Sequence, residues 1–315
     1  MQIFSLIFPI FAIIVTGFAF AQFKILPEEI AGALIQFVFY VGIPAMLFVA
    51  IAQQDTEQLL NWPFIATFGG AVAIVFLAIM IGARMFAGVD LGAATMIAMI
   101  SVASNTGIIG LPLLHSLFGH KAVVLAALAN IIVVAFLLIQ IVLLEASAEE
   151  EGKKGLKLSH LKSAVMNPVV LSTLVALAYA ISPLGVPSIV VNFLDTLGAS
   201  VAPCALFAVG MSIKPASLIK SGPVILFASS IKLFGLALLV LIICRIFELS
   251  PLVSVVAVIS AALPTAKTEF VFAKQYHEEE EIVAETVSFT TALSVITLLI
   301  WLIVLSHMYS GLFSA

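Results

Sequence analysis

Long apolar runs, separated by short polar stretches, constrain this chain more than any other feature of its sequence. Each run has the roughly 20 residues that a helix needs to cross the hydrocarbon core of a bilayer. The runs are too continuous for barrel strands, which alternate over about 10 residues. Because backbone groups in lipid must be paired internally, we expect an all-α polytopic membrane protein. About ten spans are predicted, at residues 3–22, 30–52, 62–86, 91–117, 121–145, 163–182, 188–213, 223–247, 251–275 and 283–308.

The composition excludes several classes of protein. Apolar residues make up 63% of the chain and charged residues 10%, whereas soluble proteins have about 25% charged residues. With 13 Lys and Arg in total, the chain lacks the basic stripe that phosphate contacts need. We therefore expect the lipid bilayer as a partner and no nucleic acid.

Motifs of catalysis and of nucleotide hydrolysis are absent from the sequence. It has no phosphate-binding loop, no zinc-binding HExxH helix and no GxSxG elbow. Cys204 and Cys244 lie in apolar runs and lack the spacing of metal ligands. We expect no enzymatic activity, no cofactor and no metal site. Any uphill transport must then use the gradient of the solute or of a coupled ion, H⁺ or Na⁺.

One long polar stretch, residues 146–162, divides the chain into two parts of five spans each, 1–145 and 163–315. Lys and Arg are concentrated in alternate loops, which the positive-inside rule places in the cytoplasm. Both termini then lie outside, and the protein is expected in the inner (plasma) membrane. The cytoplasmic side would hold Lys24, Arg84, Lys153, Lys154, Lys157, Lys162, Lys214, Lys220 and Lys274, and the other side Lys121 and Arg245.

Prolines recur at a nearly constant offset between the two parts. An odd number of spans per part inverts the second part relative to the first, an arrangement found in secondary transporters. Such transporters bind their substrate where corresponding spans are interrupted. The recurring pairs are Pro9 with Pro168, Pro27 with Pro187 and Pro44 with Pro203, at offsets of 159, 160 and 159, and Pro112 with Pro264 at 152.

The fourth and ninth predicted spans carry the strongest interruptions. Residues 104–112 contain two glycines and Pro112, together with the polar residues Asn105 and Thr106. Residues 263–269 contain Pro264 and Thr265. Proline removes a backbone donor and breaks a helix interior. If both helices unwind and cross near the bilayer centre, two half-helix N-termini face one cavity and favour an anion.

Charged and amide side chains inside the spans are further candidates, because burying them in a bilayer is costly. Lys267 would bind a substrate carboxylate, and Glu269 would carry a proton or bind a cation; the alternative is an ion pair between the two. Asn130 either forms an interhelical hydrogen bond or contacts the ligand. Lys232 either snorkels to an interface or pairs inside the bundle. His115 and His120 are expected in a loop.

Several short motifs together resemble one known family. They are residues 39–48 (FYVGIPAMLF), 104–107 (SNTG), 110–112 (GLP), 167–168 (NP), 203–212 (PCALFAVGMS) and 263–266 (LPTA). The chain resembles the auxin efflux carrier family, in its bacterial branch of small-carboxylate carriers. The resemblance implies ten helices in two inverted five-helix repeats, crossed fourth and ninth helices broken at prolines, a scaffold and a transport domain, and elevator-like motion. It also implies that Asn105, Pro112 and Pro264 line the substrate site. Lys267 and Glu269 depart from the more neutral residues expected there.

The prediction is a secondary active transporter of a small organic anion, a carboxylate that is either auxin-like or a dicarboxylate. Two alternatives remain open. One is a sodium-coupled symporter or a cation/proton antiporter of the crossed-helix type, with Glu269 as the coupling carboxylate. The other is a membrane sensor that binds a ligand without transporting it. A homodimer is one possible assembly.

Overall fold

The described part of the chain folds almost entirely into helices. A computed structural model describes residues 2–27, 29–53, 61–150, 168–182, 185–213 and 222–313, without the side chains of residues 2–7 and 149–150. Within these ranges, regular structure consists of α-helices and single π-helical turns (η). The elements are α1 (Gln2–Gln22), α2 (Glu29–Phe37), η1 (Val38–Gly42), α3 (Ile43–Ala52), α5 (Trp62–Phe64), η2 (Ile65–Gly69), α6 (Gly70–Gly82), η3 (Ala83–Ala87), α7 (Leu91–Val102), η4 (Thr106–Gly110), α8 (Leu111–Phe118), α9 (His120–Glu150), α11 (Pro168–Ile181), α12 (Ser188–Ala199), α13 (Val201–Met211), α14 (Pro223–Ser230), η6 (Ile231–Gly235), α15 (Leu236–Ile246), α16 (Pro251–Ala262), α17 (Thr268–Tyr276), α18 (Glu280–Met308) and α19 (Ser310–Phe313).

The helical segments match a multi-pass membrane protein. Six are long and apolar enough to cross a bilayer, and shorter apolar helices accompany them. Most of the predicted linker 146–162, the start of the sixth predicted span, and Lys214 and Lys220 lie outside the described residues. The six long helices are Glu29–Ala52, Trp62–Ala87, His120–Ala148, Ser188–Met211, Pro223–Ile246 and Glu280–Met308.

Local sequence signals set the helix ends. Asp90 caps α7 by accepting a hydrogen bond from the backbone N–H of Ala93 at 2.8 Å, and Asn61 caps α5 in the same way. Proline opens α14 and α16, where its missing N–H costs nothing. Gly119 separates α8 from α9 with a φ of 66°, a backbone conformation that favours glycine. These signals explain why the predicted boundaries fall close to the observed ones.

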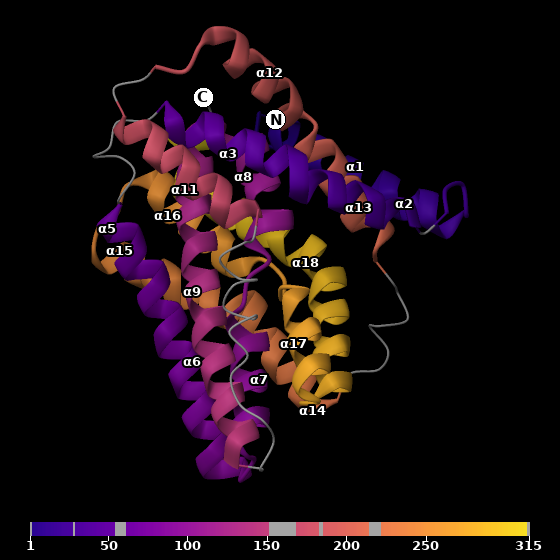
Figure 1. Cartoon of the computed structure of the whole chain (residues 1–315), viewed down its shortest axis with the longest axis vertical. Helices are drawn as coiled ribbons and strands as arrows, with labels where there is room; N and C mark the ends of the chain where they lie inside the picture. The colour runs from indigo at the N-terminus through magenta and orange to yellow at the C-terminus, as the bar shows by residue number, and fades with distance from the viewer. Residues whose placement is uncertain are drawn as a thin grey trace.

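The helices form two groups that each draw on both parts of the sequence. In the first group α1 packs on α13, and α3 packs on α11 and α12. In the second group α6 packs on α7, α15 on α16, and α18 on α14 and α17. Figure 1 shows the first group at one end of the molecule, with α6, α9, α14 and α18 extending toward the other end. The two groups meet where α9 contacts α3 and where α8 contacts α13.

Close approach of two backbones fixes the first group. A side chain on Gly17 of α1 would collide with the carbonyl oxygen of Phe207 on α13, and one on Gly210 of α13 would collide with the carbonyl oxygen of Ile14 on α1. Small residues at helix crossings are typical of membrane proteins, where packing rather than hydrophobicity drives association. The two glycines therefore let α1 and α13 lie in direct backbone contact.

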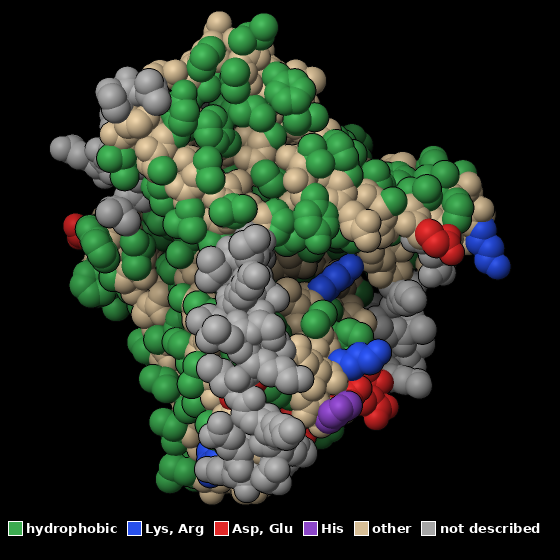
Figure 2. All heavy atoms as spheres, in the orientation of Figure 1, with side chains coloured by type: hydrophobic (Ala, Val, Ile, Leu, Met, Phe, Trp, Pro, Cys, Tyr) green, Lys and Arg blue, Asp and Glu red, His purple; other side chains and the backbone are tan. Residues whose placement is uncertain are grey.

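The outer surface is apolar, as lipid requires. Large hydrophobic side chains are exposed on many helices, among them Phe86 at 89% and Ile189 at 77%, and extensive exposed apolar surface marks a membrane or partner interface. Hydrophobic side chains are spread over the upper and left parts of the face seen in Figure 2, and charged side chains gather in a few places. A bilayer is therefore the natural surrounding of the molecule.

Candidate functional site

Two interrupted helices meet inside the second group. The first interruption separates α7 from η4 at residues 103–105, and the second separates α16 from α17 at residues 263–267. Both lie in segments that the sequence marks as breaks. The two interruptions contact each other, and we call residues 103–105 and 264–266 the crossover.

Backbone hydrogen bonds join the two sides of the crossover. The N–H of Asn105 donates to the carbonyl of Pro264 at 2.9 Å, and the N–H of Ala266 donates to the carbonyl of Ala103 at 2.9 Å. The middle residues of the two segments form an isolated antiparallel bridge. Because unpaired backbone groups are expensive in a membrane interior, this exchange makes both breaks tolerable.

Hydroxyl groups pair with two further backbone groups at or next to the crossover. The Thr265 hydroxyl donates to the carbonyl of Ile100 at 2.8 Å, in the last turn of α7. The N–H of Thr265 donates to the hydroxyl oxygen of Thr290 on α18 at 3.2 Å. Thr265 is fully buried. It therefore ties the second break to both α7 and α18.

Asn105 begins the half-helix that follows the first break. Its side-chain oxygen accepts a hydrogen bond from the N–H of Ile108 at 3.3 Å, the usual geometry of an N-cap. Its amide nitrogen is buried and has no hydrogen-bond partner among the described residues. An unpaired buried donor at a helix N-terminus is suited to an anionic ligand.

Pro112 does not lie in the first break, contrary to the predicted interruption over residues 104–112. It lies inside the η4–α8 helix and is buried. The N–H of Leu111 donates to the carbonyl of Thr106, five residues earlier, which makes η4 a π-turn. This wider turn accommodates the proline ring without ending the helix. Pro264 differs, because it lies within the break itself.

Asn130 supports the first break from α9. Its side-chain oxygen accepts a hydrogen bond from the hydroxyl of Thr106 at 2.9 Å, and both residues are buried. This is the interhelical hydrogen bond that the sequence analysis offered as one alternative.

Lys232 also lies at the crossover, which the sequence did not predict. Its side chain is fully buried. Its ammonium donates to the hydroxyl oxygen of Ser104 at 2.9 Å and to the carbonyl of Ala261 at 2.6 Å. The sequence does show a lysine near the middle of an apolar span. Its position along the helix does not show which neighbouring helix its side chain faces.

Glu269 is fully buried on α17 and does not pair with Lys267 in a described contact. One carboxylate oxygen accepts a hydrogen bond from the side-chain amide of Gln140 on α9 at 2.7 Å. The other oxygen has no hydrogen-bond partner among the described residues, and neither has the amide oxygen of Gln140. The same amide nitrogen lies 3.3 Å from the sulfur of Met96. Gln140 was not singled out from the sequence, although a glutamine in an apolar run is a signal of this kind.

Lys267 faces a cavity instead of a carboxylate. The cavity has a volume of about 400 Å³ and lies between α13 of the first group and α17 and α18 of the second. The lysine and an aromatic ring would suit a small anion with an apolar part, whereas each of the three hydroxyls in the lining donates to a backbone carbonyl four residues earlier. The polar and aromatic side chains that line it are Lys267, Ser212, Ser288, Thr291 and Phe270.

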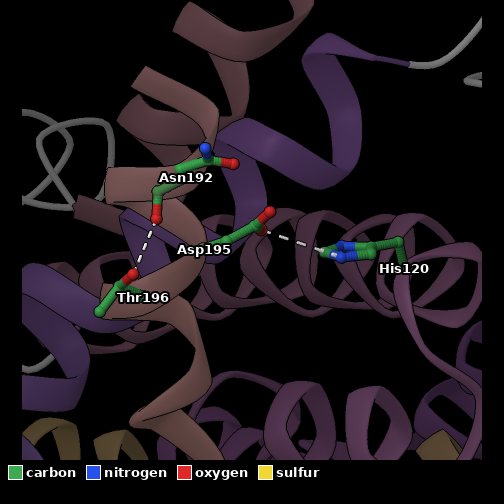
Figure 3. Close-up of polar contacts among 4 residues, drawn as sticks. All are labelled: His120, Asn192, Asp195 and Thr196. Atoms are coloured by element: carbon green, nitrogen blue, oxygen red, sulfur yellow. Dashed lines mark hydrogen bonds and ion pairs between the residues drawn. The ribbon is translucent and has the colours of Figure 1, made fainter. Parts of the chain in front are cut away.

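A second polar contact joins the two groups of helices away from the crossover. His120, the first residue of α9, lies 3.9 Å from the carboxylate of Asp195 on α12, and both side chains are nearly half exposed. Figure 3 shows Asp195 pointing toward His120, while Thr196 bonds to the backbone of Asn192 within α12. The expected loop placement of the histidines is wrong, because His115 lies in the last turn of α8 and only Gly119 separates the two helices.

These features define a class of protein: a multi-pass membrane protein whose interrupted helices meet beside a polar cavity. Comparison with known proteins identifies the family. The family model described as membrane transport protein matches residues 2–302. The chain therefore belongs to this family, which is the auxin efflux carrier family that its motifs resemble.

Similar proteins cover nearly the whole chain. A protein of Rhizobium meliloti (strain 1021) named "Putative malonate transporter" is 28% identical over 300 residues, covering 94% of this chain and 93% of the relative. An uncharacterized transporter of Methanocaldococcus jannaschii is 23% identical over 302 residues, covering 92% and 94%. An uncharacterized transporter of Escherichia coli (strain K12) is 24% identical over 280 residues, covering 85% and 87%. The family and these relatives are transporters and not enzymes.

Proposed function

We propose that this protein is a secondary active transporter of a small organic anion, which it moves across the inner (plasma) membrane by alternating access around the crossover. The observation that carries the proposal is the position of Lys267. It lies directly before the N-terminus of α17 and lines the 400 Å³ cavity next to the crossover. The lysine side chain and the adjacent N-terminus of α17 both attract a carboxylate.

The substrate that fits best is a small carboxylate with two acidic groups or with one acidic group and an apolar body. Lys267 would bind a carboxylate, and Ser288 and Thr291, whose hydroxyls donate to carbonyls of α18, would line the site beside it. Phe270 would contact the apolar part of an auxin-like molecule. The name of the Rhizobium meliloti relative favours a dicarboxylate such as malonate.

The proposed architecture has ten spans in two inverted repeats, residues 1–145 and 163–315, joined by a cytoplasmic linker at 146–162, with both termini outside. Contacts support a second division, into the two helix groups of Figure 1. The first group would serve as the scaffold, and the group that holds the crossover would move against it. The cavity lies between the groups, so such a motion would open it to either side in turn. Assembly as a homodimer through the scaffold is part of the proposal.

Coupling to an ion gradient would use Glu269. A buried carboxylate with a single described hydrogen bond, to Gln140, is costly to keep charged in a membrane interior. It would therefore take up H⁺ or Na⁺ in one of the two access states. A sodium-coupled symporter or a cation/proton antiporter of the crossed-helix type is the alternative in which Glu269 dominates. Dependence of the flux on Na⁺ or on pH separates these schemes.

Counterflow in proteoliposomes tests the proposal. Purified protein is reconstituted with unlabelled malonate inside, and uptake of labelled malonate is followed; malate and an auxin-like acid are tested in the same way. We expect Lys267→Ala to reduce counterflow at low substrate by about tenfold or more, because a charge-assisted contact is lost. The matched control is Lys274→Ala, in the last turn of the same helix and exposed.

Two results would contradict the proposal. One is binding of the acids, measured as a thermal shift, without any flux, which would favour a ligand sensor. The other is equal counterflow by the Lys267→Ala and Lys274→Ala variants, which would remove Lys267 from the substrate site.

A further inference from the structure

A buried positive charge lies at the crossover, and the transport proposal above gives it no role. Lys232 belongs to η6, nine residues from the start of the apolar span Pro223–Ile246 and 14 from its end. At 1.5 Å per residue this is about 13 Å from the nearer end, too deep for simple snorkelling to an interface. Among the described residues no carboxylate pairs with it. Ionisable side chains this deep in a membrane span are rare and usually have a function.

The second break explains why Lys232 finds an acceptor there. In an uninterrupted helix the carbonyl of Ala261 would accept the N–H of Thr265, four residues later. That N–H instead donates to Thr290. The freed carbonyl accepts from the Lys232 ammonium at 2.6 Å.

The first break supplies the second acceptor. The same ammonium donates to the hydroxyl oxygen of Ser104, between α7 and η4, at 2.9 Å. One side chain from a third span therefore bridges both interruptions. Ser104 and Ala261 are both buried, so removal of the ammonium would take this donor from two buried oxygens.

The position of the ammonium is one that a cation is expected to occupy. α7 and α16 both end at the crossover, and the carbonyl end of a helix carries about half a negative charge. In transporters with interrupted helices, freed carbonyls and half-helix C-terminal ends coordinate the coupling Na⁺ or H⁺. Here a hydroxyl and a carbonyl, both neutral oxygens, surround a lysine ammonium instead.

We propose that Lys232 is the resident cation of the crossover, a positioning residue whose ammonium takes the place of a bound alkali cation at the carbonyl ends of the two broken helices. It holds Ser104 and Ala261 in register and places a cationic side chain at the carbonyl ends of α7 and α16. Substrate exchange then needs no Na⁺ at this position. The expected effect on substrate exchange rests on the proposed transport function, whereas the placement of the Lys232 ammonium at the crossover does not.

Transport measures the consequence. Malonate counterflow is compared in Na⁺ and in N-methylglucamine for wild type, Lys232→Met, Lys232→Ala and the control Lys274→Ala. We expect Lys232→Met to lose about tenfold or more of the rate of wild type and of the control in both media, because neutral oxygens then lack their donor. Ethylammonium should restore part of the Lys232→Ala rate. A Lys232→Met variant at the wild-type rate, or ethylammonium that changes the wild-type and Lys232→Ala rates equally, would overturn the inference.

Thermal unfolding tests the cation without any substrate. We expect Lys232→Ala to unfold at a lower temperature than wild type, and ethylammonium to raise the midpoint of this variant alone, because a ligand stabilises only a state that binds it. If Lys232→Ala does not fold, Lys232→Arg should be more stable than Lys232→Met. The resident cation would be refuted if ethylammonium raised the unfolding midpoint of wild type, Lys274→Ala and Lys232→Ala equally. It would also be refuted if Lys232→Met unfolded at the same temperature as Lys232→Arg. Absence of counterflow in wild type together with selective stabilisation of Lys232→Ala would refute only the transport proposal.

Discussion

The two interrupted helices exchange the same kind of backbone hydrogen bonds but differ in the side chains that follow the break. Asn105 is the last residue of the first break and Thr106 follows it, and both are neutral. Lys267 is the last residue of the second break and Glu269 comes two residues later, and both have ionisable side chains. The crossing itself is held by backbone hydrogen bonds, by two threonine hydroxyls and by Lys232, and neither the Lys267 nor the Glu269 side chain takes part in its described hydrogen bonds.

The far ends of the two half-helices differ as well. The first leads through Gly119 to His120, which makes a half-exposed contact of 3.9 Å with Asp195. The second ends at Tyr276, whose hydroxyl donates to the Glu145 carboxylate at 2.6 Å. Burial and the neighbouring Glu145 carboxylate raise the pKa of Tyr276 above its usual range, so the hydroxyl keeps its proton. The second half-helix is thus the more firmly attached at its end.

Asn105→Asp should have the largest effect, because it gives the first break the charge that it lacks. Aspartate caps a helix as well as asparagine does, so the half-helix should persist. The unpaired amide donor becomes a negative charge, which should weaken malonate binding by about tenfold or more through like-charge repulsion. Isothermal titration of purified protein measures this. Unchanged affinity would show that the anion does not approach Asn105.

Thr265→Val tests the second break at its backbone connection. Valine has nearly the shape of threonine but leaves the carbonyl of Ile100 without its described partner. A buried acceptor left unpaired costs about 1–3 kcal/mol of folding free energy. The control is Thr196→Val, which removes an exposed hydroxyl that bonds within its own helix. A melting temperature of Thr265→Val equal to that of the control would mean that the Thr265 hydroxyl does not support the crossing.

The sequence predicted the breaks better than their surroundings, for physical reasons. Pro264 falls in its break because proline lacks the N–H that the preceding turn needs. The first break was placed too far along, because a π-turn absorbs Pro112 and hydropathy does not distinguish a π-turn from an α-turn. Lys232 and Gln140 were not assigned to the site, because each faces a partner more than a hundred residues away, Ser104 and Glu269. Composition shows that a polar group is buried, but only packing shows what it faces.

Tyr276→Phe should have a smaller effect, confined to the end of the second half-helix. It removes the hydroxyl that binds Glu145 and keeps the ring. We expect a loss of about 1 kcal/mol, the net value of one such hydrogen bond. Amide hydrogen exchange followed by mass spectrometry should show faster exchange in α17 and unchanged exchange in η4 and α8. Equal acceleration in both half-helices would contradict a separate attachment of each end.

Asp195→Asn should have the smallest effect, because it removes an exposed contact at the end of the first half-helix. Exposed ion pairs contribute about 0–1 kcal/mol and are screened by salt. The distance of 3.9 Å and the nearly half-exposed side chains place this pair at the weak end of that range. We expect a melting temperature within experimental error of wild type at high salt and slightly lower at low salt. A decrease at high salt as large as the decrease caused by Tyr276→Phe would mean that both half-helices are held equally at their ends. The two broken helices would then differ only in the charges beside the crossover.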